Sequence, residues 1–482
     1  MAESLKKKTV KGVVWSGLDS ILGHGVTFLV GIVLARLLSP AEYGLIAICL
    51  IFTTVLHGIV DSGFSNSLIR KKDVTNNDYN TMFITNMVMS IVLYCLLFVA
   101  APLVAAFFER PELVSLVRAM GLILFLQALS ITQSTILTKR IDFKTKTKAS
   151  FFSAVVSGAI GIVMAYLGFG VWSLVGQKLS EKLLYTICLW VLNRWWPNFT
   201  FSRESFNYMW GYGWKLMVSG LLNNIWNQIY QVVVGKCYSP ATLGQYGRSR
   251  EYAHIFSQTL TGIVQRVTFP ALAALQDDKT RLVAAYRKII KVSMFMTTIC
   301  MIPLGAVAEP LIYCLIGPKW YEASTYLPLI CLSMSLHPLH AINLNMLQVQ
   351  GRSDLFLYLE IVKKFISIIP IGLGIFVDIY WMLVGSIVTG IITFFLNSYY
   401  TGRMLGYTSW MQLRDVMPSY KVAFLIAIPI YFIKYLSLSQ FAILFLQLLV
   451  GAIIYFCICQ LYDIYEYNEL KNILTNYFKH KK

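Results

Sequence analysis

The chain has 482 residues, of which 57% are hydrophobic and 13% are charged. A soluble globular domain has about 25% charged residues, so this composition excludes an ordinary water-soluble enzyme, and the high hydrophobicity excludes a disordered chain. The formal net charge is +18. In a soluble protein this excess would indicate nucleic-acid binding, but in a membrane protein it is explained by basic cytoplasmic loops, and no nucleic-acid partner is expected.

Apolar runs of about 20 residues, long enough to cross a bilayer as helices, recur along the whole sequence. They predict an all-α polytopic membrane protein with 14 transmembrane helices. The first run contains Asp19 and His24 and is predicted to be retained as a helix rather than cleaved as a signal peptide. In chain order, the predicted spans cover about 13–37, 44–63, 81–107, 113–136, 149–167, 171–192, 209–235, 244–270, 289–315, 325–348, 355–377, 381–401, 421–436 and 440–462.

The loops between these runs differ sharply in charge. Lysines and arginines gather in every second loop, as in 139–148, whereas the opposite loops carry only Arg110, Lys236, Lys319 and Lys434. Because basic residues collect in cytoplasmic loops, the crowded loops and both termini are predicted to be cytoplasmic.

A short motif occurs twice, after the first predicted span and after the seventh. Ser39–Gly44 reads SPAEYG, and Ser239–Gly244 reads SPATLG. The match predicts two parallel repeats of six spans, namely an N-terminal lobe over 1–205 and a second lobe over 206–405. Two extra helices and a tail occupy 406–482. Two six-helix lobes suit transport by alternating access.

Polar side chains inside the predicted spans are the candidates for a transport path. A charge at the bilayer centre costs about 3 kcal/mol or more, so it usually faces a cavity or a partner. Basic residues outnumber acidic ones in the spans, which predicts a net positive cavity for an anionic substrate such as a phosphate or pyrophosphate. The candidate substrate-binding residues are Arg36, Lys178, Lys182, Lys215, Asn223, Asn227, Arg248, Arg250 and Lys364, and the candidate ion-coupling residues are Asp61, Glu181 and Glu360.

The charged candidates have structural alternatives. Lys178 and Lys182 share one helical face with Glu181, and Lys364 shares one with Glu360. Internal ion pairing is therefore an equal alternative to substrate binding, although an exchange of pairs can itself gate a transporter. Snorkelling to lipid headgroups is the alternative for Arg36, Lys215, Arg248 and Arg250.

The uncharged candidates and Asp61 also have structural roles as alternatives to a role in transport. Asn223, Asn227 and Gln231 recur at intervals of four and form a polar stripe. This stripe could line a hydrated path and bind sugar hydroxyls, or it could hold helices together. For Asp61, helix capping is favoured over ion coupling.

The motifs of several enzyme classes are missing from the sequence. There is no GxxxxGK[ST] phosphate loop and no DxD motif, and the outer loops are too short for a catalytic domain, so no enzyme is expected. No CxxC pair is present, and His337 and His340 lack a third ligand, so neither a metal nor a cofactor is expected. Pro338 between these histidines predicts a distorted helix. Energy must then come from an ion gradient, the substrate gradient or a partner.

A series of short motifs in a fixed order resembles the Wzx-type polysaccharide exporters of the MOP flippase superfamily, most closely the colanic-acid-exporter-like branch. The resemblance covers nearly the whole chain. One departure is Tyr246-Gly247-Arg248, where a Tyr-Asn-Arg sequence is expected. The motifs are Leu34–Gly44 (LARLLSPAEYG), Asp61–Phe64 (DSGF) with Leu68–Arg70, Arg140–Phe143 (RIDF), Leu167–Trp172 (LGFGVW), Arg194–Pro197 (RWWP), Leu243–Tyr246 (LGQY), Phe269–Leu272 (FPAL), Gly317–Trp320 (GPKW) and Gln350–Asp354 (QGRSD).

This resemblance implies a flippase of the bacterial inner membrane. Its substrate would be an undecaprenyl-pyrophosphate-linked oligosaccharide repeat unit for O-antigen, capsule or exopolysaccharide, moved from the inner to the outer leaflet. Membrane lipids, a proton or sodium ion, a polysaccharide polymerase and glycosyltransferases are the other partners that it implies. A multidrug cation antiporter of the same superfamily, which would favour an acidic cavity, and a lipid II flippase remain alternatives.

Overall fold

The computed structural model describes residues 25–469 and 471. Asp19 and His24, which the sequence places in the first span, lie outside the described residues. The described chain forms helices and no strand, and it divides after Gly244 into two compact units.

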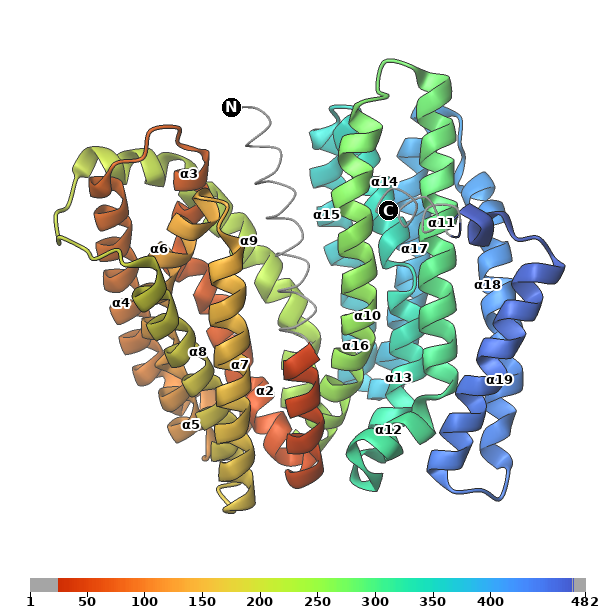
Figure 1. Ribbon diagram of the computed structural model, residues 1–482, viewed down its shortest axis with the longest axis horizontal. Coiled ribbons are helices and arrows are strands. Elements are labelled where there is room, and N and C mark those ends of the chain that lie inside the picture. The colour runs from red at the N-terminus through yellow and green to blue at the C-terminus, as the bar shows by residue number, and fades with distance from the viewer. Residues whose placement is uncertain (1–24, 470, 472–482) are drawn as a thin grey trace, which may run out of the picture. The chain divides into compact units, whose positions relative to one another are not determined.

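The first unit begins with the helix Gly25–Leu37. Within it, α7 and α8 pack along each other, α6 contacts both, and α9 packs on α2, α3 and α4 (Figure 1). Its further helices are α2 (Pro40–Asp61), α3 (Phe64–Arg70), α4 (Asn76–Phe108), α5 (Leu113–Gly121), α6 (Ile123–Lys139), α7 (Phe143–Tyr166), α8 (Val171–Asn193) and α9 (Arg203–Cys237).

The second unit has a buried cluster where α11 packs against α14 and α18, with Tyr286, Ile290 and Met294 of α11 almost completely buried. Its helices are α10 (Pro240–Ala273), whose first turn belongs to the first unit, α11 (Lys279–Ala306), α12 (Ala308–Ile316), η1 (Pro318–Trp320), α13 (Tyr321–Met334), α14 (His337–Val349), α15 (Ser353–Ile366), α16 (Ile368–Phe376), α17 (Ile379–Leu405), α18 (Ser409–Phe432), η2 (Ile433–Tyr435) and α19 (Gln440–Leu461).

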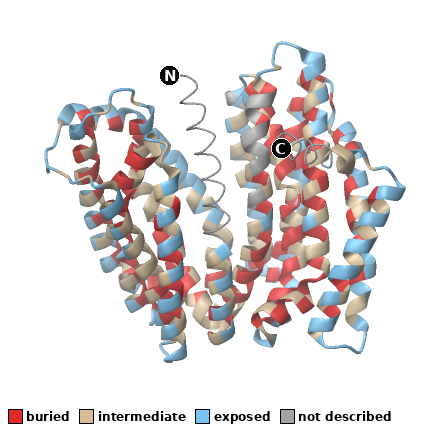
Figure 2. Ribbon diagram, viewed as in Figure 1, coloured by how far each residue is buried: buried red, intermediate tan, exposed pale blue. Residues whose placement is uncertain are grey.

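Large apolar side chains cover the outward faces of many helices. Leu96, Val99 and Leu103 on α4 are each more than half exposed. Figure 2 shows exposed residues along α19, whose main packing partners are α12, α18 and η2. Exposed apolar surface of this extent is unfavourable in water but is what hydrocarbon requires. The chain is therefore a multi-pass membrane protein.

Nine helical segments in the described part of the chain are long and apolar enough to cross a membrane. The remaining predicted spans are the helix Gly25–Leu37, α8, α9, α10 and the pair α15–α16, and the last four carry charged residues within them. Together these five spans hold all of the candidate charges except Asp61, with Arg36 at the end of the helix Gly25–Leu37. The count of 14 and the lobe boundaries at 205 and 405 stay predictions.

Four predicted continuous spans are interrupted by a short break, and a fifth ends close to its predicted boundary. The span 44–63 ends at Asp61 because Ser62 (φ 50°) and Gly63 (φ 71°) adopt left-handed backbone conformations. The four breaks separate α5 from α6, α11 from α12, α13 from α14, and α15 from α16. The distortion predicted at Pro338 is confirmed, since α14 starts at His337 with the proline in its first turn, where the missing N–H has no helical partner.

The repeated motif forms the same local structure at both sites. Ser39 caps α2 with a capping box completed by Glu42, and the Ser239 hydroxyl accepts a hydrogen bond from the N–H of Thr242 at 3.1 Å at the start of α10. Each serine satisfies an N–H group that the helix geometry leaves without a partner. The sequence repeat is thus also a structural repeat of two capped helix starts.

Candidate functional site

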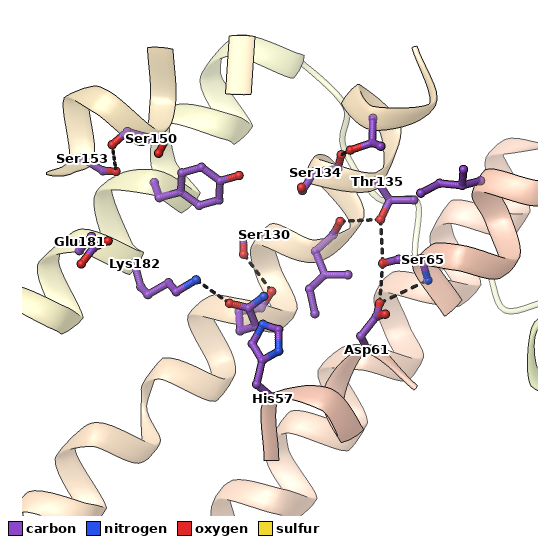
Figure 3. Close-up of a pocket in the computed structure, with 15 residues that line it drawn as sticks. His57, Asp61, Ser65, Ser130, Ser134, Thr135, Ser150, Ser153, Glu181 and Lys182 are labelled. Carbon is purple, nitrogen blue, oxygen red and sulfur yellow. Dashed lines mark hydrogen bonds between the residues drawn. The ribbon is translucent and has the colours of Figure 1, made fainter. Parts of the chain in front are cut away.

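A polar pocket of about 400 Å³ lies inside the first unit, within the size range of small-molecule sites (Figure 3). Five helices build it: α2, α3, α6, α7 and α8. Its lining combines ionisable groups, an amide, hydroxyls and one aromatic ring: His57, Asp61, Ser65, Ile69, Gln127, Ser130, Ile131, Ser134, Thr135, Thr138, Ser150, Ser153, Glu181, Lys182 and Tyr185. A polar pocket between apolar helices marks a functional site, since such groups are costly in hydrocarbon.

One wall of the pocket is a chain of hydrogen bonds that starts at Asp61. The Ser65 hydroxyl donates to Asp61 Oδ1 at 2.5 Å, and the Ser65 N–H donates to the same oxygen at 3.3 Å. Thr135 on α6 continues the chain, with its hydroxyl 2.9 Å from that of Ser65 (Figure 3). Asp61 therefore caps the first turn of α3, as the sequence favoured, and its side chain also lines the pocket.

The opposite wall is centred on Lys182. Its ammonium donates to Gln127 Oε1 on α6 at 2.9 Å, and Gln127 and Lys182 both interact with His57 from α2. Glu181 lines the pocket beside Lys182 and pairs with Lys178, whose Nζ lies 3.2 Å from its Oε2. Of the two pairings that the sequence allowed for Glu181, the structure shows the one with Lys178.

The structure thus brings three predicted residues, Asp61, Glu181 and Lys182, to one pocket. Two carboxylates and one ammonium line it, so it is not the net positive cavity that the span charges predict. The reason is local: Lys178, which would add a second ammonium, is bound to Glu181 and is not a lining residue.

The other candidates of the first unit lie outside the pocket. Arg36 is exposed at the end of the helix Gly25–Leu37. Lys215, Asn223 and Asn227 lie on α9 and are also exposed. Their use by a substrate stays a prediction.

The second unit holds the remaining candidates on α10 and α15. Arg248 is 5% exposed, and its guanidinium lies 2.6 Å from Glu251 on the same helix. Arg250 is half-buried. Of the two alternatives that the sequence left open for Lys364, pairing with Glu360 is not the one formed, since Glu360 pairs with Lys363, three positions away and on the same face.

The sequence reasoning missed most of the uncharged pocket lining, together with His57. A usable signal was present, because His57, Asp61 and Ser65 are spaced by four residues, and Gln127, Ser130, Ser134 and Thr138 by three or four, as on one helical face. What the spacing could not show is that these two faces point at each other and at Lys182.

The comparisons with known proteins agree on one family. Residues 33–325 match the family described as "Polysaccharide biosynthesis protein". The chain is 28% identical to the succinoglycan biosynthesis transport protein ExoT of Rhizobium meliloti (strain 1021), over 70% of this chain and 68% of the relative. It is 24% identical to the teichuronic acid biosynthesis protein TuaB of Bacillus subtilis (strain 168), over 74% of each. The lipopolysaccharide biosynthesis protein WzxC of Escherichia coli (strain K12) is 23% identical over 77% of this chain and 76% of its own length.

Solved structures place the fold among known transporters. The lipid II flippase MurJ in an inward closed conformation matches with a TM-score of 0.73 at 14% identity, covering 96% of this chain and 99% of its own. A multidrug resistance MATE family transporter of the MOP superfamily, in an inward-facing conformation, matches with a TM-score of 0.60 at 16% identity, over 83% and 99%. At these identities the likeness is one of fold. The resemblance to polysaccharide exporters is confirmed by the family match.

Proposed function

The chain belongs to the polysaccharide biosynthesis protein family, and from this membership we propose that it is a flippase for an undecaprenyl-pyrophosphate-linked oligosaccharide repeat unit. It would move this lipid from the inner to the outer leaflet of the bacterial inner membrane, for O-antigen, capsule or exopolysaccharide assembly. The observation that carries the proposal is the polar pocket inside a membrane-spanning unit, because a channel for lipid tails alone would need no such site.

The exposed basic residues are the proposed contacts for the pyrophosphate. Arg36 and Lys215 are exposed in the first unit, and a cation with water access can bind a phosphate without the full desolvation cost of a buried one. In the second unit the proposed contacts are Arg250 and Lys364, which are half-buried, together with Arg248, which is buried and paired with Glu251. Asn223 and Asn227, exposed on α9, can donate to and accept from sugar hydroxyls.

The movement would follow alternating access, with the polyprenyl tail remaining in the bilayer. Asp61, Glu181 and Glu360 are the proposed coupling residues for a proton or a sodium ion. Glu181 is well suited to this role because Lys178 and Lys182 flank it on one helix face, so a change in its charge would redistribute two ammonium groups. The N- and C-termini would both be cytoplasmic.

The test is deletion of the gene, followed by mass spectrometry of undecaprenyl-linked saccharides with leaflet-selective labelling. The expected result is a lipid-linked repeat unit trapped in the inner leaflet, restored by the wild-type gene but not by the double variant Lys178→Ala/Lys182→Ala. Lys236→Ala is the control, since Lys236 pairs with Glu109 on an exposed surface. Normal outward delivery of every such lipid, with related transporter genes also deleted, would overturn the proposal.

A further inference from the structure

Several hydroxyl groups that line the pocket of the first unit give their protons to backbone carbonyl groups. Ser130 donates its proton to the carbonyl of Gln127 at 3.0 Å, and Ser153 donates to the carbonyl of Ser150 at 2.9 Å. Thr138 likewise donates to the Ser134 carbonyl at 2.8 Å, and one of its two lone pairs accepts from Lys146 at 3.0 Å. A hydroxyl has one proton and two lone pairs, so a side chain that gives its proton to the backbone remains an acceptor.

The charged lining adds further acceptors and few donors. Asp61 and Glu181 contribute carboxylates, which accept only. Lys182 donates one of its three N–H groups to Gln127 Oε1 and has two others, and the Gln127 amide and the His57 ring are the uncharged N–H donors of the lining. The pocket therefore favours a ligand that brings several hydrogen-bond donors of its own.

This balance separates the classes of ligand that a transporter of lipid-linked saccharides could admit. A phosphate has only acceptor oxygens and negative charge, so it would face two carboxylates and the lone pairs of the hydroxyls. A bare monovalent cation suits an acceptor-rich lining, but it would leave most of the roughly 400 Å³ unfilled, where a single water takes about 30 Å³. A sugar ring supplies several hydroxyl donors and fills a site of this size.

We propose that this pocket binds one uncharged sugar residue of the saccharide, separately from the pyrophosphate. The proposal rests on the proposed function for its ligand and adds a sugar subsite enclosed by α2, α3, α6, α7 and α8. The acceptors on α6 and α7 would take up the ring hydroxyls, and Lys182 would donate to a ring or glycosidic oxygen. Tyr185, whose ring lies 5.9 Å from Lys182 Nζ, supplies an apolar face for the sugar C–H groups.

The experiment is saturation-transfer NMR on the full-length protein in lipid nanodiscs, with D-glucose, D-galactose and N-acetyl-D-glucosamine as separate probes. This method detects the weak binding expected of a single sugar. Transfer to at least one probe, competed by that same sugar's methyl glycoside, is expected. Transfer to none of the three would overturn the proposal.

Two neighbouring serines on α7 provide a matched pair. Ser153 lines the pocket, whereas Ser157, one turn later, is equally buried and donates to the Ala154 carbonyl outside the lining. Ser153→Ala should weaken the dissociation constant about three- to tenfold, the value of one lost hydrogen bond, and Gln127→Ala should do the same. Ser157→Ala should leave binding unchanged. Equal effects at Ser153 and Ser157 would contradict the assigned location.

Competing ions test the other ligand classes. Sodium chloride and inorganic phosphate are added as competitors, and choline chloride is the control for ionic strength. If either competitor abolished the sugar signal and choline chloride did not, the pocket would be assigned to an ion and the proposal would be overturned. The leaflet assay separates this result from the proposed function. Normal flipping by the wild type with no transfer to any of the three sugars would overturn only the subsite, whereas sugar binding without any flipping would overturn only the proposed flippase.

Discussion

Gly44 and Gly244 each lie against the backbone of the proline that starts the other residue's helix. A Cβ atom on Gly44 would be 1.8 Å from the carbonyl oxygen of Pro240, and one on Gly244 would be 1.9 Å from that of Pro40. The two copies of the repeated motif therefore contact each other reciprocally. Glycine is required at both positions because the neighbouring atoms belong to backbone and cannot rotate away.

We predict that Gly44→Ala and Gly244→Ala each lower stability by clearly more than the about 1 kcal/mol typical of a point substitution. The added methyl group must separate two helix starts that are in backbone contact. The apparent melting temperature of the protein in detergent is the measurement. Gly220→Ala on α9 is the control, since no atom lies within 4 Å of its Cβ position, and alanine should stabilise that helix slightly. A melting temperature for Gly44→Ala equal to that of Gly220→Ala would refute the contact.

The reciprocal glycine contact shows what the sequence could and could not predict. The motif pair was visible as a repeat, and its serines and prolines are ordinary signals of a helix start. That Gly44 and Gly244 meet depends on how α2 and α9 pack, which no local pattern encodes. The end of the second span near Asp61 was predicted, but the contact at Gly63 was not: a Cβ on Gly63 would lie 2.5 Å from the Gly213 carbonyl oxygen of α9, a neighbour 150 positions away along the chain.

The candidate site was likewise predictable from the sequence only in part. Helical spacing was sufficient to place Glu181 and Lys182 together, because residues at neighbouring positions of one helix need no tertiary information. It could not identify Gln127 as the partner of Lys182, since that bond joins α6 to α8. The partner of Glu360 could not be identified either, because spacings of three and four share a face, and only rotamers decide between Lys363 and Lys364.

The bond between Lys182 and Gln127 predicts an energetic coupling between α8 and α6. Lys182→Met should lower the free energy of unfolding by about 1–3 kcal/mol, because the Gln127 carbonyl in the protein interior loses its donor. Gln127→Leu should cost a similar amount, and the double variant should cost less than the sum of both. Unfolding in a graded series of denaturing detergent would measure all three. Strict additivity would mean that the two side chains do not interact.

Asp415 on α18 should be the main polar anchor of the second unit. It is 6% exposed, accepts from the Tyr407 hydroxyl at 2.7 Å, and pairs with Arg287 and Lys291 of α11. Asp415→Asn removes the charge that both cations face, so we expect a loss of about 1–3 kcal/mol. Asp354→Asn is the matched control, since Asp354 pairs with Arg352 on an exposed surface, where ion pairs contribute little.

The same melting measurement decides this case, with one addition. High salt should reduce the difference in melting temperature between the wild type and Asp354→Asn, because exposed charges are screened. It should leave the Asp415→Asn difference nearly unchanged. If Asp415→Asn melted like the wild type at both salt concentrations, the anchor would have no energetic role.

The ion pair between Lys288 and Glu469 should make the segment after α19 sensitive to acid. The two charged atoms lie 2.7 Å apart. The hydrogen bond from the Lys288 ammonium lowers the pKa of Glu469 below its ordinary value of 4.5. Stabilisation by the carboxylate is therefore complete above pH 4.5 and is lost as the pH falls through the lowered pKa of Glu469.

Hydrogen–deuterium exchange of residues 464–468, corrected for intrinsic rates, would measure this release. At pH 7, Glu469→Gln should exchange faster than wild type, because the amide carries no charge for Lys288, whereas Glu466→Gln should not. On acidification the wild type should approach the exchange of Glu469→Gln only below pH 4.5, since protonation of the carboxylate abolishes the same attraction. Faster wild-type exchange already between pH 6 and 7 would place the titrating group elsewhere, because neither member of this pair changes charge in that range.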